Sequence, residues 1–311
     1  MIFNPTAKGN KARHFRRHLN EIAAGCALKP TRQAGEAAHL AREAVEEGFD
    51  TIVAAGGDGT VNEVLNGLAT APDGLARARL GVLPLGTVNV FALEHGIPFK
   101  LQSAFETIRR GAARTVDLPW VELPSGGRTK RLCFAQMAGA GLDARAVERV
   151  DWTTKKRVGR LAYALAFLQA LNERRPLVEC RWGGERFSGE WVLLGNGRFY
   201  AGPYAFFPKA VPSDGLLDVC VYPRLDWWTL MRFALGAVVG RVYAPPDMRY
   251  FQCEQLELHS VQRVPLELDG EAAGELPAIV RVEKQRLRVI AAWSAAGSQE
   301  PASSMGPGRS G

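Results

Sequence analysis

The residues best suited to chemistry are Gly-Gly-Asp-Gly-Thr at positions 56–60. Three glycines within four residues remove the side chains that would keep a bulky anion away from the backbone. A helical pattern of apolar residues begins at Val61, so the free N–H groups of a helix start would face this loop and favour phosphate. Asp58 would repel a phosphate unless a cation such as Mg²⁺ lay between them. The segment indicates a loop for nucleotide phosphates, with an ordinary strand-to-helix turn as the alternative.

Two other loops follow strand-like runs and precede helix-like ones. Residues 4–10 include Lys8, which would either supply charge to phosphates or face solvent, and they lack the Gly-Lys-Ser/Thr ending of a Walker A loop. Residues 84–89 offer Gly86, a hydroxyl and an amide at a helix start. In structural terms, Thr87 would cap the helix that follows residues 84–89.

Two Asp-Gly pairs occur late in the chain, Asp214-Gly215 and Asp269-Gly270, and Glu271 follows the second. Asp-Gly is a common signature of a tight turn. The residue types alone therefore favour plain turns at both places.

Residues 56–68, GGDGTVNEVLNGL, resemble the signature of the diacylglycerol kinase catalytic-domain superfamily, which includes sphingosine kinases and bacterial lipid kinases. Further segments fall in that family's order and spacing: residues 4–7, Thr31 before a helix at Gly35, residues 84–89, and the two late Asp-Gly pairs. The resemblance covers nearly the whole chain, from Asn4 to about Trp293.

The resemblance implies an ATP- and Mg²⁺-dependent lipid kinase that phosphorylates a lipid hydroxyl, with diacylglycerol as the first expected acceptor. It implies that Glu271 is the general base and that Asp58 holds the catalytic metal. The nucleotide contacts implied in this way are Asn4, Pro5, Thr6, Thr31, Gly56, Gly57, Asp58, Gly59, Thr60, Asn62, Glu63, Gly86, Thr87 and Asn89. A structural Mg²⁺ is implied at the Asp214 side chain and the carbonyls of Val211 and Leu216.

The sequence is also compatible with other acceptors and with other functions. A sphingoid base, a glycolipid or phosphatidylglycerol could replace diacylglycerol. Many family members have Gly-Asn-Asp where this chain has Val88-Asn89-Val90, so this chain lacks an acid that those members have near the acceptor site. One rival is a NAD-kinase-like enzyme with a soluble acceptor, and another is a non-catalytic lipid or nucleotide sensor on the same fold.

Over residues 1–115 the sequence pattern alternates between strand and helix. Strands are expected at 2–3, 27–31, 51–55 and 80–83, and helices at 11–23, 35–47, 61–68 and 101–110. This alternation predicts an α/β fold with a parallel sheet, whose strand carboxyl ends would hold the ligand.

From residue 116 the pattern changes to short alternating runs typical of antiparallel strands. Strands are expected at 115–123, 131–138, 178–182, 190–195, 217–222, 255–259, 265–268 and 287–293, with one helix at 156–171. We predict an N-terminal nucleotide-binding domain over 1–115, completed by 285–293, and a β-rich, sandwich-like acceptor domain over 116–284. The tail at 294–311 is rich in Ala, Ser, Gly and Pro and is expected to be disordered.

Composition limits the partners. A net charge of +7 suits an anionic partner, while the absence of an RRM-like aromatic box, zinc-finger spacing and long Lys/Arg blocks argues against nucleic acid. The five cysteines are scattered, as expected of buried thiols in a reducing compartment. No signal peptide or transmembrane run stands out, so we expect a cytoplasmic protein, peripheral at the inner face of the membrane, with a homodimer left open.

Two aromatic segments have paired interpretations. Residues 199–207 would line the entrance for an acyl chain or belong to the core. Trp227-Trp228 with Met231 would insert into a membrane interface, where Trp is favoured, or pack internally.

Overall fold

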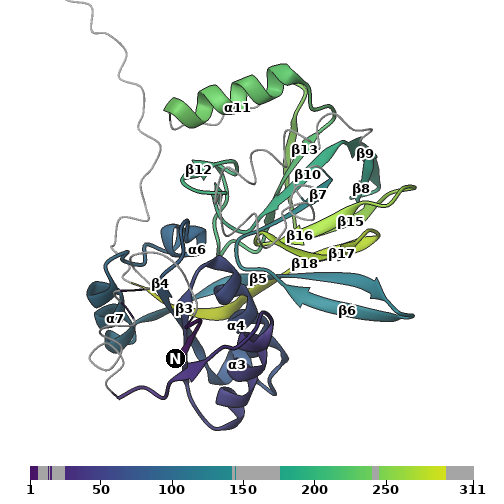
Figure 1. Ribbon diagram of the computed structural model, residues 1–311. Coiled ribbons are helices and arrows are strands. Elements are labelled where there is room, and N and C mark those ends of the chain that lie inside the picture. Colours follow the sequence, from purple (N-terminus) through teal and green to yellow (C-terminus); the bar gives the residue numbers. More distant parts are fainter. Residues whose placement is uncertain are drawn as a thin grey trace, which may run out of the picture.

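The computed structural model of the chain describes residues 1–5, 13, 15, 25–141, 144, 176–239 and 245–291 (Figure 1). Most of the expected helix at 11–23, the whole of that at 156–171, and the tail from 294 lie outside the described residues. No described helix is both long and apolar enough to cross a bilayer.

The first half is an α/β unit. Its parallel strands are β1 (Ile2–Phe3), β2 (Lys29–Pro30), β3 (Thr51–Gly56) and β4 (Arg79–Pro84), in the order β2-β1-β3-β4. Its helices are α3 (Glu36–Glu46), α4 (Asp58–Thr70), α5 (Gly74–Arg77), α6 (Val90–Glu94) and α7 (Leu101–Arg110). In Figure 1, α3 and α4 lie on one side of β3 and β4, and α7 lies on the other. Both faces of these strands are covered, which is why β3 and β4 read as continuous apolar runs.

Small residues allow α3 and α4 to pack closely. Ala37, Ala41 and Ala44 of α3 are buried. A Cβ atom on Gly67 of α4 would lie 2.2 Å from the carbonyl oxygen of Ala38, so only glycine fits there. This contact holds α4 at a fixed position beside the sheet, with its first turn beyond the carboxyl end of β3.

Two long strands continue the sheet into the second half: β5 (Ala113–Ser125) and β18 (Ala278–Ile290). They pair antiparallel along most of their length, and Val289 of β18 also pairs in parallel with Leu80 of β4. The expected strand at 287–293 therefore starts nine residues earlier, at Ala278. A bulge between Glu283 and Leu287, with Gln285 at φ 50°, carries the strand across a charged segment that hides it in the sequence.

The second half is a β sandwich. The first sheet continues through β15 (Gln255–His259), β8 (Val178–Trp182) and β9 (Glu185–Gly189), while β6 (Arg128–Cys133) pairs with β5. The second sheet is antiparallel, in the order β14 (Arg249–Cys253), β13 (Leu217–Tyr222), β10 (Trp191–Gly195), β7 (Met137–Gly141), β16 (Pro265–Leu268) and β17 (Glu271–Glu275). A short pair, β11 (Phe199–Tyr200) and β12 (Tyr204–Ala205), and the helix α11 (Trp227–Val239) complete the described elements. The predicted fold class, a parallel α/β unit followed by an antiparallel sandwich, is confirmed.

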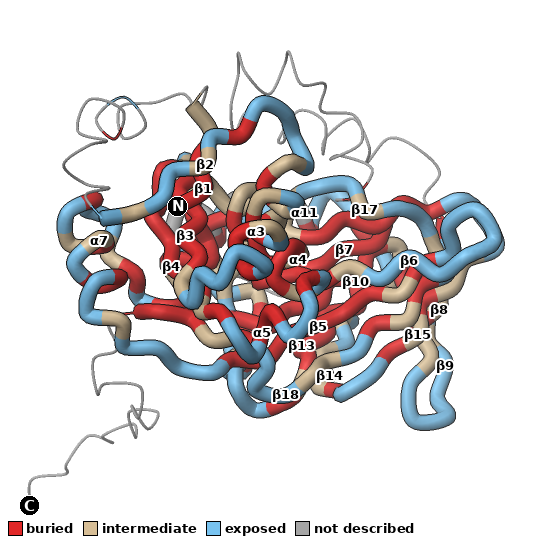
Figure 2. Tube along the Cα trace, turned by 90° about the horizontal axis from the view of Figure 1, so that it is seen from below, coloured by how far each residue is buried: buried red, intermediate tan, exposed pale blue. Residues whose placement is uncertain are grey.

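The alternation along β10 shows how the sandwich is filled. Val192 and Leu194 face the core between the two sheets, whereas Trp191 and Leu193 face a second cluster on the outer side. Figure 2 shows β10 and β7 buried, as are β3 and β4, while the β8–β9 hairpin extends into solvent. A strand buried on both faces reads as a purely apolar run, as β10 does.

The expected single strand at 131–138 is two strands, β6 and β7, because the backbone between them leaves the ladder. The N–H groups of Ala135, Gln136 and Met137 all donate to the carboxylate of Asp269. The break therefore frees three successive N–H groups to bind one carboxylate.

Candidate active site

Two glycine loops meet at the carboxyl ends of β3 and β4. A Cβ atom on Gly86 would lie 2.6 Å from the Cα of Gly57, and one on Gly57 would lie 3.3 Å from the Cα of Gly86. Leu85 N–H also donates to the Gly56 carbonyl at 2.9 Å. The two backbones approach so closely that a side chain at position 86 would collide with Gly57 and one at position 57 would be tightly crowded, and an open backbone surface results.

Helix α4 begins at Asp58, three residues before the expected start at Val61. Asp58, Gly59 and Thr60 therefore form its first turn, where backbone N–H groups lack partners within the helix. Gly56 leaves room for this turn, since a Cβ atom there would lie 2.3 Å from Thr60 Oγ1. The N–H groups and the positive end of the α4 dipole give this turn the chemistry of an anion site.

The second loop is closed by Asn89 rather than by Thr87. Asn89 has φ 56°, its Oδ1 accepts from Gly86 N–H at 2.9 Å, and its Nδ2 donates to the Gly86 carbonyl at 2.8 Å. Helix α6 starts at Val90 with no side-chain cap, and Thr87 is exposed three residues earlier. The predicted helix cap by Thr87 is wrong. The residue before the helix is Asn89, where the backbone is left-handed, and the side-chain amide of Asn89 closes the loop on Gly86.

The half-buried carboxylate of Asp58 joins the two loops. Its Oδ1 accepts from Phe91 N–H of α6 at 3.1 Å, so the charge lies between the N-termini of α4 and α6. Burial raises the pKa of the Asp58 carboxyl, while N–H groups at Phe91, Val90 and Asn89 lower it. Asp58 thus has a structural partner as well as the charge expected of a metal ligand.

Glu271 lies over the first turn of α4. Asp269 and Gly270, both at positive φ, make the turn between β16 and β17, as Asp-Gly commonly does in hairpins. This turn places Glu271 so that a Cβ atom on Gly59 would lie 3.2 Å from Glu271 Oε1. The structure therefore brings together Gly59 and Glu271, which the sequence places in separate motifs.

Asp269 anchors this hairpin from beneath. Its carboxylate accepts backbone N–H groups from Ala135 at 2.6 Å, Gln136 at 2.9 Å and Met137 at 3.0 Å, and Asn62 Nδ2 at 2.7 Å. Burial raises the pKa of Asp269, and these four donors oppose that shift. Asp269 was not among the predicted site residues, although its Asp-Gly pair is one of the segments that resemble the family.

Two asparagines one turn apart tie α4 to the sandwich. Asn66 exchanges a pair of 2.9 Å hydrogen bonds with the backbone of Cys133, donating to its carbonyl and accepting from its N–H. Asn62, a predicted nucleotide contact, directs its amide to Asp269 and, at 3.3 Å, to the Cys133 carbonyl. Its nucleotide contact stays a prediction.

Other predicted nucleotide contacts lie around the same edge of the sheet. Glu63 accepts from Gly35 N–H at 2.9 Å and Ala37 N–H at 3.0 Å, so it caps the start of α3. Thr31 is buried, and its backbone N–H donates to the Phe3 carbonyl at 2.9 Å. Asn4 and Pro5 directly follow β1, and Thr6 lies outside the described residues.

The predicted structural metal site lies in an exposed loop before β13. Asp214 Oδ1 accepts from Leu216 N–H at 2.9 Å, and the Val211 carbonyl accepts from Asp214 N–H at 3.2 Å. Burial is the main cause that raises the pKa of Asp214, and the negative charge of nearby Asp117 raises it further. Hydrogen bonds from backbone N–H groups oppose this shift. The available donors are oxygen atoms, so they fit Mg²⁺, although the turn is also closed without an ion.

Buried Asp117 holds this loop to β18, and the sequence did not single it out. Its carboxylate accepts Gly215 N–H at 2.6 Å and Gln285 N–H at 2.7 Å. The second bond explains how Gln285 is stabilised at positive φ in the bulge of β18.

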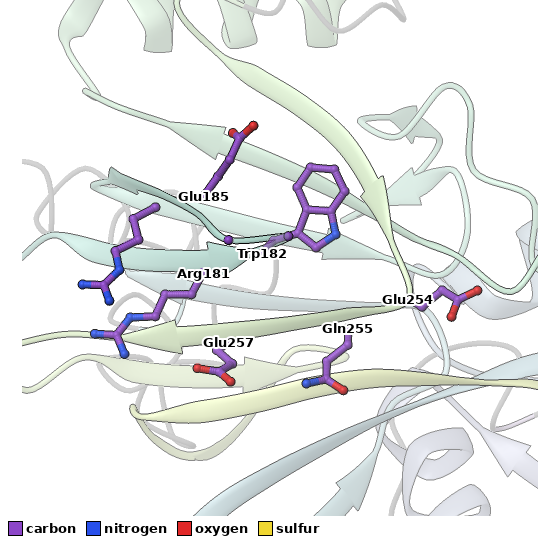
Figure 3. Close-up of a pocket in the computed structure, with 9 residues that line it drawn as sticks. Arg181, Trp182, Glu185, Glu254, Gln255 and Glu257 are labelled. Carbon is purple, nitrogen blue, oxygen red and sulfur yellow. The ribbon is translucent and has the colours of Figure 1, made fainter.

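A wide hollow of about 590 Å³ lies elsewhere, on the β8–β9 hairpin and β15. Figure 3 shows its lining, which includes Arg181, Trp182 and Glu257. It contains none of the predicted site residues, and its open, charged lining gives no enclosed surface for a ligand.

Comparisons with known proteins match the two halves of the chain to two family models. The model of the diacylglycerol kinase catalytic domain matches residues 1–121, and that of the YegS C-terminal NAD kinase beta sandwich-like domain matches residues 136–291. Diacylglycerol kinase of Bacillus subtilis is 33% identical over 290 residues, covering 89% of this chain and 90% of that protein. A probable lipid kinase, YegS-like, of Xanthomonas oryzae pv. oryzae is 36% identical over 255 residues, covering 78% of this chain and 79% of that one.

A crystal structure described as a putative diacylglycerol kinase from Bacillus anthracis has the same fold. It matches with a TM-score of 0.75 over 94% of both chains, at 23% sequence identity. At that identity the likeness concerns the fold alone.

Proposed function

This chain belongs to the diacylglycerol kinase catalytic-domain family, and we propose that it transfers the γ-phosphate of ATP to the hydroxyl group of a membrane lipid. Diacylglycerol is the first expected acceptor, because the Bacillus subtilis relative bears that name. A lipid kinase of unspecified acceptor is the coarser description that the YegS-like relative supports.

The placement of Glu271 is the observation that supports this proposal best. Its carboxylate lies against Gly59, in the helix turn that offers N–H groups to an anion. An acceptor hydroxyl held between Glu271 and a phosphate on this turn would be close to both a base and its target. Phosphoryl transfer depends mainly on such positioning and on stabilising charge.

The proposed chemistry assigns one role to each group. Glu271 accepts the proton of the lipid hydroxyl as the hydroxyl oxygen bonds to the γ-phosphorus, and ADP leaves with the electrons of the broken P–O bond. The backbone of residues 57–60 and of Gly86 binds the phosphates. Asn62, through Asp269, keeps the base and the phosphate turn at a constant separation.

The residues present fit Mg²⁺ at the phosphates, with Asp58 as the protein ligand. No group of three His, Cys, Asp or Glu side chains suited to a metal occurs in the described part of the chain. Mg²⁺ commonly uses one or two carboxylates and completes its shell with phosphate oxygens and water. When bound, it would neutralise charge on the transferred phosphoryl group.

The NAD-kinase-like rival draws on the second family model, whose description names a NAD kinase beta sandwich-like domain. An assay with radiolabelled ATP distinguishes the candidates. Purified protein is given dispersed diacylglycerol, a sphingoid base, phosphatidylglycerol or NAD in separate reactions. Label in a lipid product supports the proposal, label only in NADP supports the rival, and no transfer to any acceptor would favour the non-catalytic sensor.

A further inference from the structure

One face of α11 presents large apolar side chains to solvent. Their exposed fractions are 60% for Trp227, 71% for Trp228, 59% for Met231 and 60% for Leu235. At about 100° of rotation per residue, these positions fall within roughly 100° of the helix circumference. Single exposed apolar residues are common, but a contiguous group on one element indicates an interaction surface.

The opposite face of α11 is anchored in the protein. Phe233 packs on Phe206 and Tyr222, with ring centroids 5.5 and 5.7 Å apart, and Thr229 is buried. Figure 1 shows α11 lying along the outside of the second sheet, at the end of the molecule away from α3. The exposed face is therefore held outward by well-packed contacts on the other side of the helix.

The chain segment that forms the helix has two arginines and one acidic residue, and Glu190 accepts from Leu225 N–H at 2.8 Å just before the helix start. Arg224 and Arg232 are exposed. Asp226 is the only acidic residue between positions 224 and 239, and its Oδ1 accepts both the N–H and the hydroxyl of Thr229 at 2.8 Å. This cap fixes the helix start, so Trp227 and Trp228 occupy the first turn.

We propose that this face of α11, consisting of Trp227, Trp228, Met231 and Leu235, docks on the surface of an anionic lipid bilayer. The inference rests on the proposed function, in that it names how the enzyme reaches its acceptor. Indole rings favour the level of the lipid headgroups, and a short helix with one apolar face lies in the plane of the interface. Anionic headgroups would neutralise the arginines, and the whole chain bears a net charge of +7. A second copy of the chain would bring two more arginines, rather than anionic groups, to this face.

Aromatic contacts connect this face with the second glycine loop. Phe233 contacts Phe206, and the ring of Phe206 lies 5.0 Å from that of Tyr200. Between β11 and β12, a Cβ atom on Gly202 would lie 3.9 Å from Val88 Cγ1. Docking through α11 would therefore place the bilayer near the aromatic segment 199–207, which leads to residues 84–89.

Vesicle binding by matched variants tests the inference. The vesicles contain equal parts of phosphatidylglycerol and phosphatidylcholine, and binding is measured by co-sedimentation. The double variant Trp227→Ser/Trp228→Ser removes apolar area from the docking face, and Leu177→Ser/Val261→Ser removes exposed apolar side chains elsewhere. We expect the first to lose at least about tenfold in partitioning, and the second to bind like the original protein.

Charge and depth provide two independent readouts. Arg224→Glu/Arg232→Glu should weaken binding to anionic vesicles, and added salt should weaken binding of the original protein, whereas Arg110→Glu/Arg128→Glu should bind more strongly than the first charge variant. Brominated acyl chains should quench tryptophan emission of the original protein more than that of Trp227→Ser/Trp228→Ser. Quenching needs no folded variant, so absence of any quenching on bound vesicles would overturn the inference.

Activity separates this inference from the proposed function. The tryptophan variant should lose activity toward diacylglycerol in vesicles and retain it toward a short-chain diacylglycerol dispersed as monomers. A variant that binds and phosphorylates in vesicles like the original protein would overturn the docking face and leave the kinase intact. An original protein that phosphorylates neither form but binds vesicles through α11 would overturn the kinase and leave the docking face. A dimer that the tryptophan variant dissociates, with vesicle binding unchanged, would show that a second copy occupies this face.

Discussion

The side-chain amide of Asn62 donates to Asp269 Oδ2 at 2.7 Å, joining residues 207 positions apart. Asn62 lies one turn into α4, and Asp269 makes the turn that leads to Glu271. This bond, together with three backbone N–H groups on the same carboxylate, couples the phosphate turn to the proposed base. The candidate site is therefore held together by a part-buried polar contact between the two halves of the molecule.

Asp269→Asn should lower the free energy of unfolding by about 1–3 kcal/mol, because an amide NH₂ would face donors that now meet a carboxylate oxygen. Urea denaturation measures the effect. Asp73→Asn is the matched control, since Asp73 also has positive φ (53°) but makes no side-chain cap to its helix. Equal stability of the two variants would mean that the contacts of Asp269 contribute nothing.

Glu271→Gln should retain ATP binding and lose about 10²–10⁴-fold in phosphorylation rate, because glutamine cannot accept a proton. Glu275→Gln changes an exposed glutamate on the same strand and should be nearly neutral. Normal turnover by Glu271→Gln would remove this residue from the mechanism and leave the base unassigned.

Substitutions of Asp58 should separate its charge from its hydrogen bond. Asp58→Asn can still accept from Phe91 N–H, so its stability should stay close to normal while transfer falls by at least about 10²–10³-fold. Asp58→Ala should lose activity and, in addition, about 0.5–2 kcal/mol of stability, as when a helix cap is removed. Steady-state kinetics and thermal unfolding of both variants are the measurements. A folded Asp58→Asn protein with near-normal turnover would exclude the metal role.

Asp214→Ala should reduce the stabilisation that Mg²⁺ gives the protein. An ion that binds only the folded state raises the melting temperature. The Asp214 carboxylate is the only side-chain ligand among the three residues implied to bind this ion. Melting is compared in Mg²⁺ and in chelator, with Asp247→Ala as a control at another exposed aspartate. If Mg²⁺ shifts the melting temperature of Asp214→Ala and the original protein equally, Asp214 serves only the turn.

His95 should make stability depend on pH. Burial lowers the pKa of this imidazole to about 4 from the ordinary 6.5. Between these two pH values, the histidine is protonated in the unfolded chain and neutral in the folded protein. The contribution of His95 to the free energy of unfolding is fully present above pH 6.5. It is lost as the pH falls toward about 4, by a few kcal/mol in all.

His95→Gln should remove this slope, whatever its effect on stability at neutral pH. The free energy of unfolding is measured by urea titration across the same pH interval. His39→Gln changes an exposed histidine and should preserve the slope. A slope equal in His95→Gln and the original protein would assign the acid sensitivity to other groups.

Much of the arrangement could be predicted from local patterns. The strands at 178–182, 217–222, 255–259 and 265–268 and the helix at 101–110 have the expected bounds, because their apolar periodicity is unbroken. The start of α4 could not be predicted in the same way. Apolar periodicity begins at Val61, but the helix begins at Asp58, whose carboxylate has its partner in another loop.

The family, the fold class and the loops with the chemistry for phosphate could be inferred from the sequence, because glycine spacing and apolar periodicity are local properties of the chain. The pairs of residues that meet became known from the folded protein: Glu271 with Gly59, Asn62 with Asp269, and Gly57 with Gly86. These contacts depend on sheet register and on how one half packs against the other. They also gave Glu63 and Asn62 partners within the protein, which residue type alone could not indicate. Hydrogen bonds between distant residues produce no periodic pattern in the sequence. The contacts within the candidate site could therefore be identified only from the folded protein.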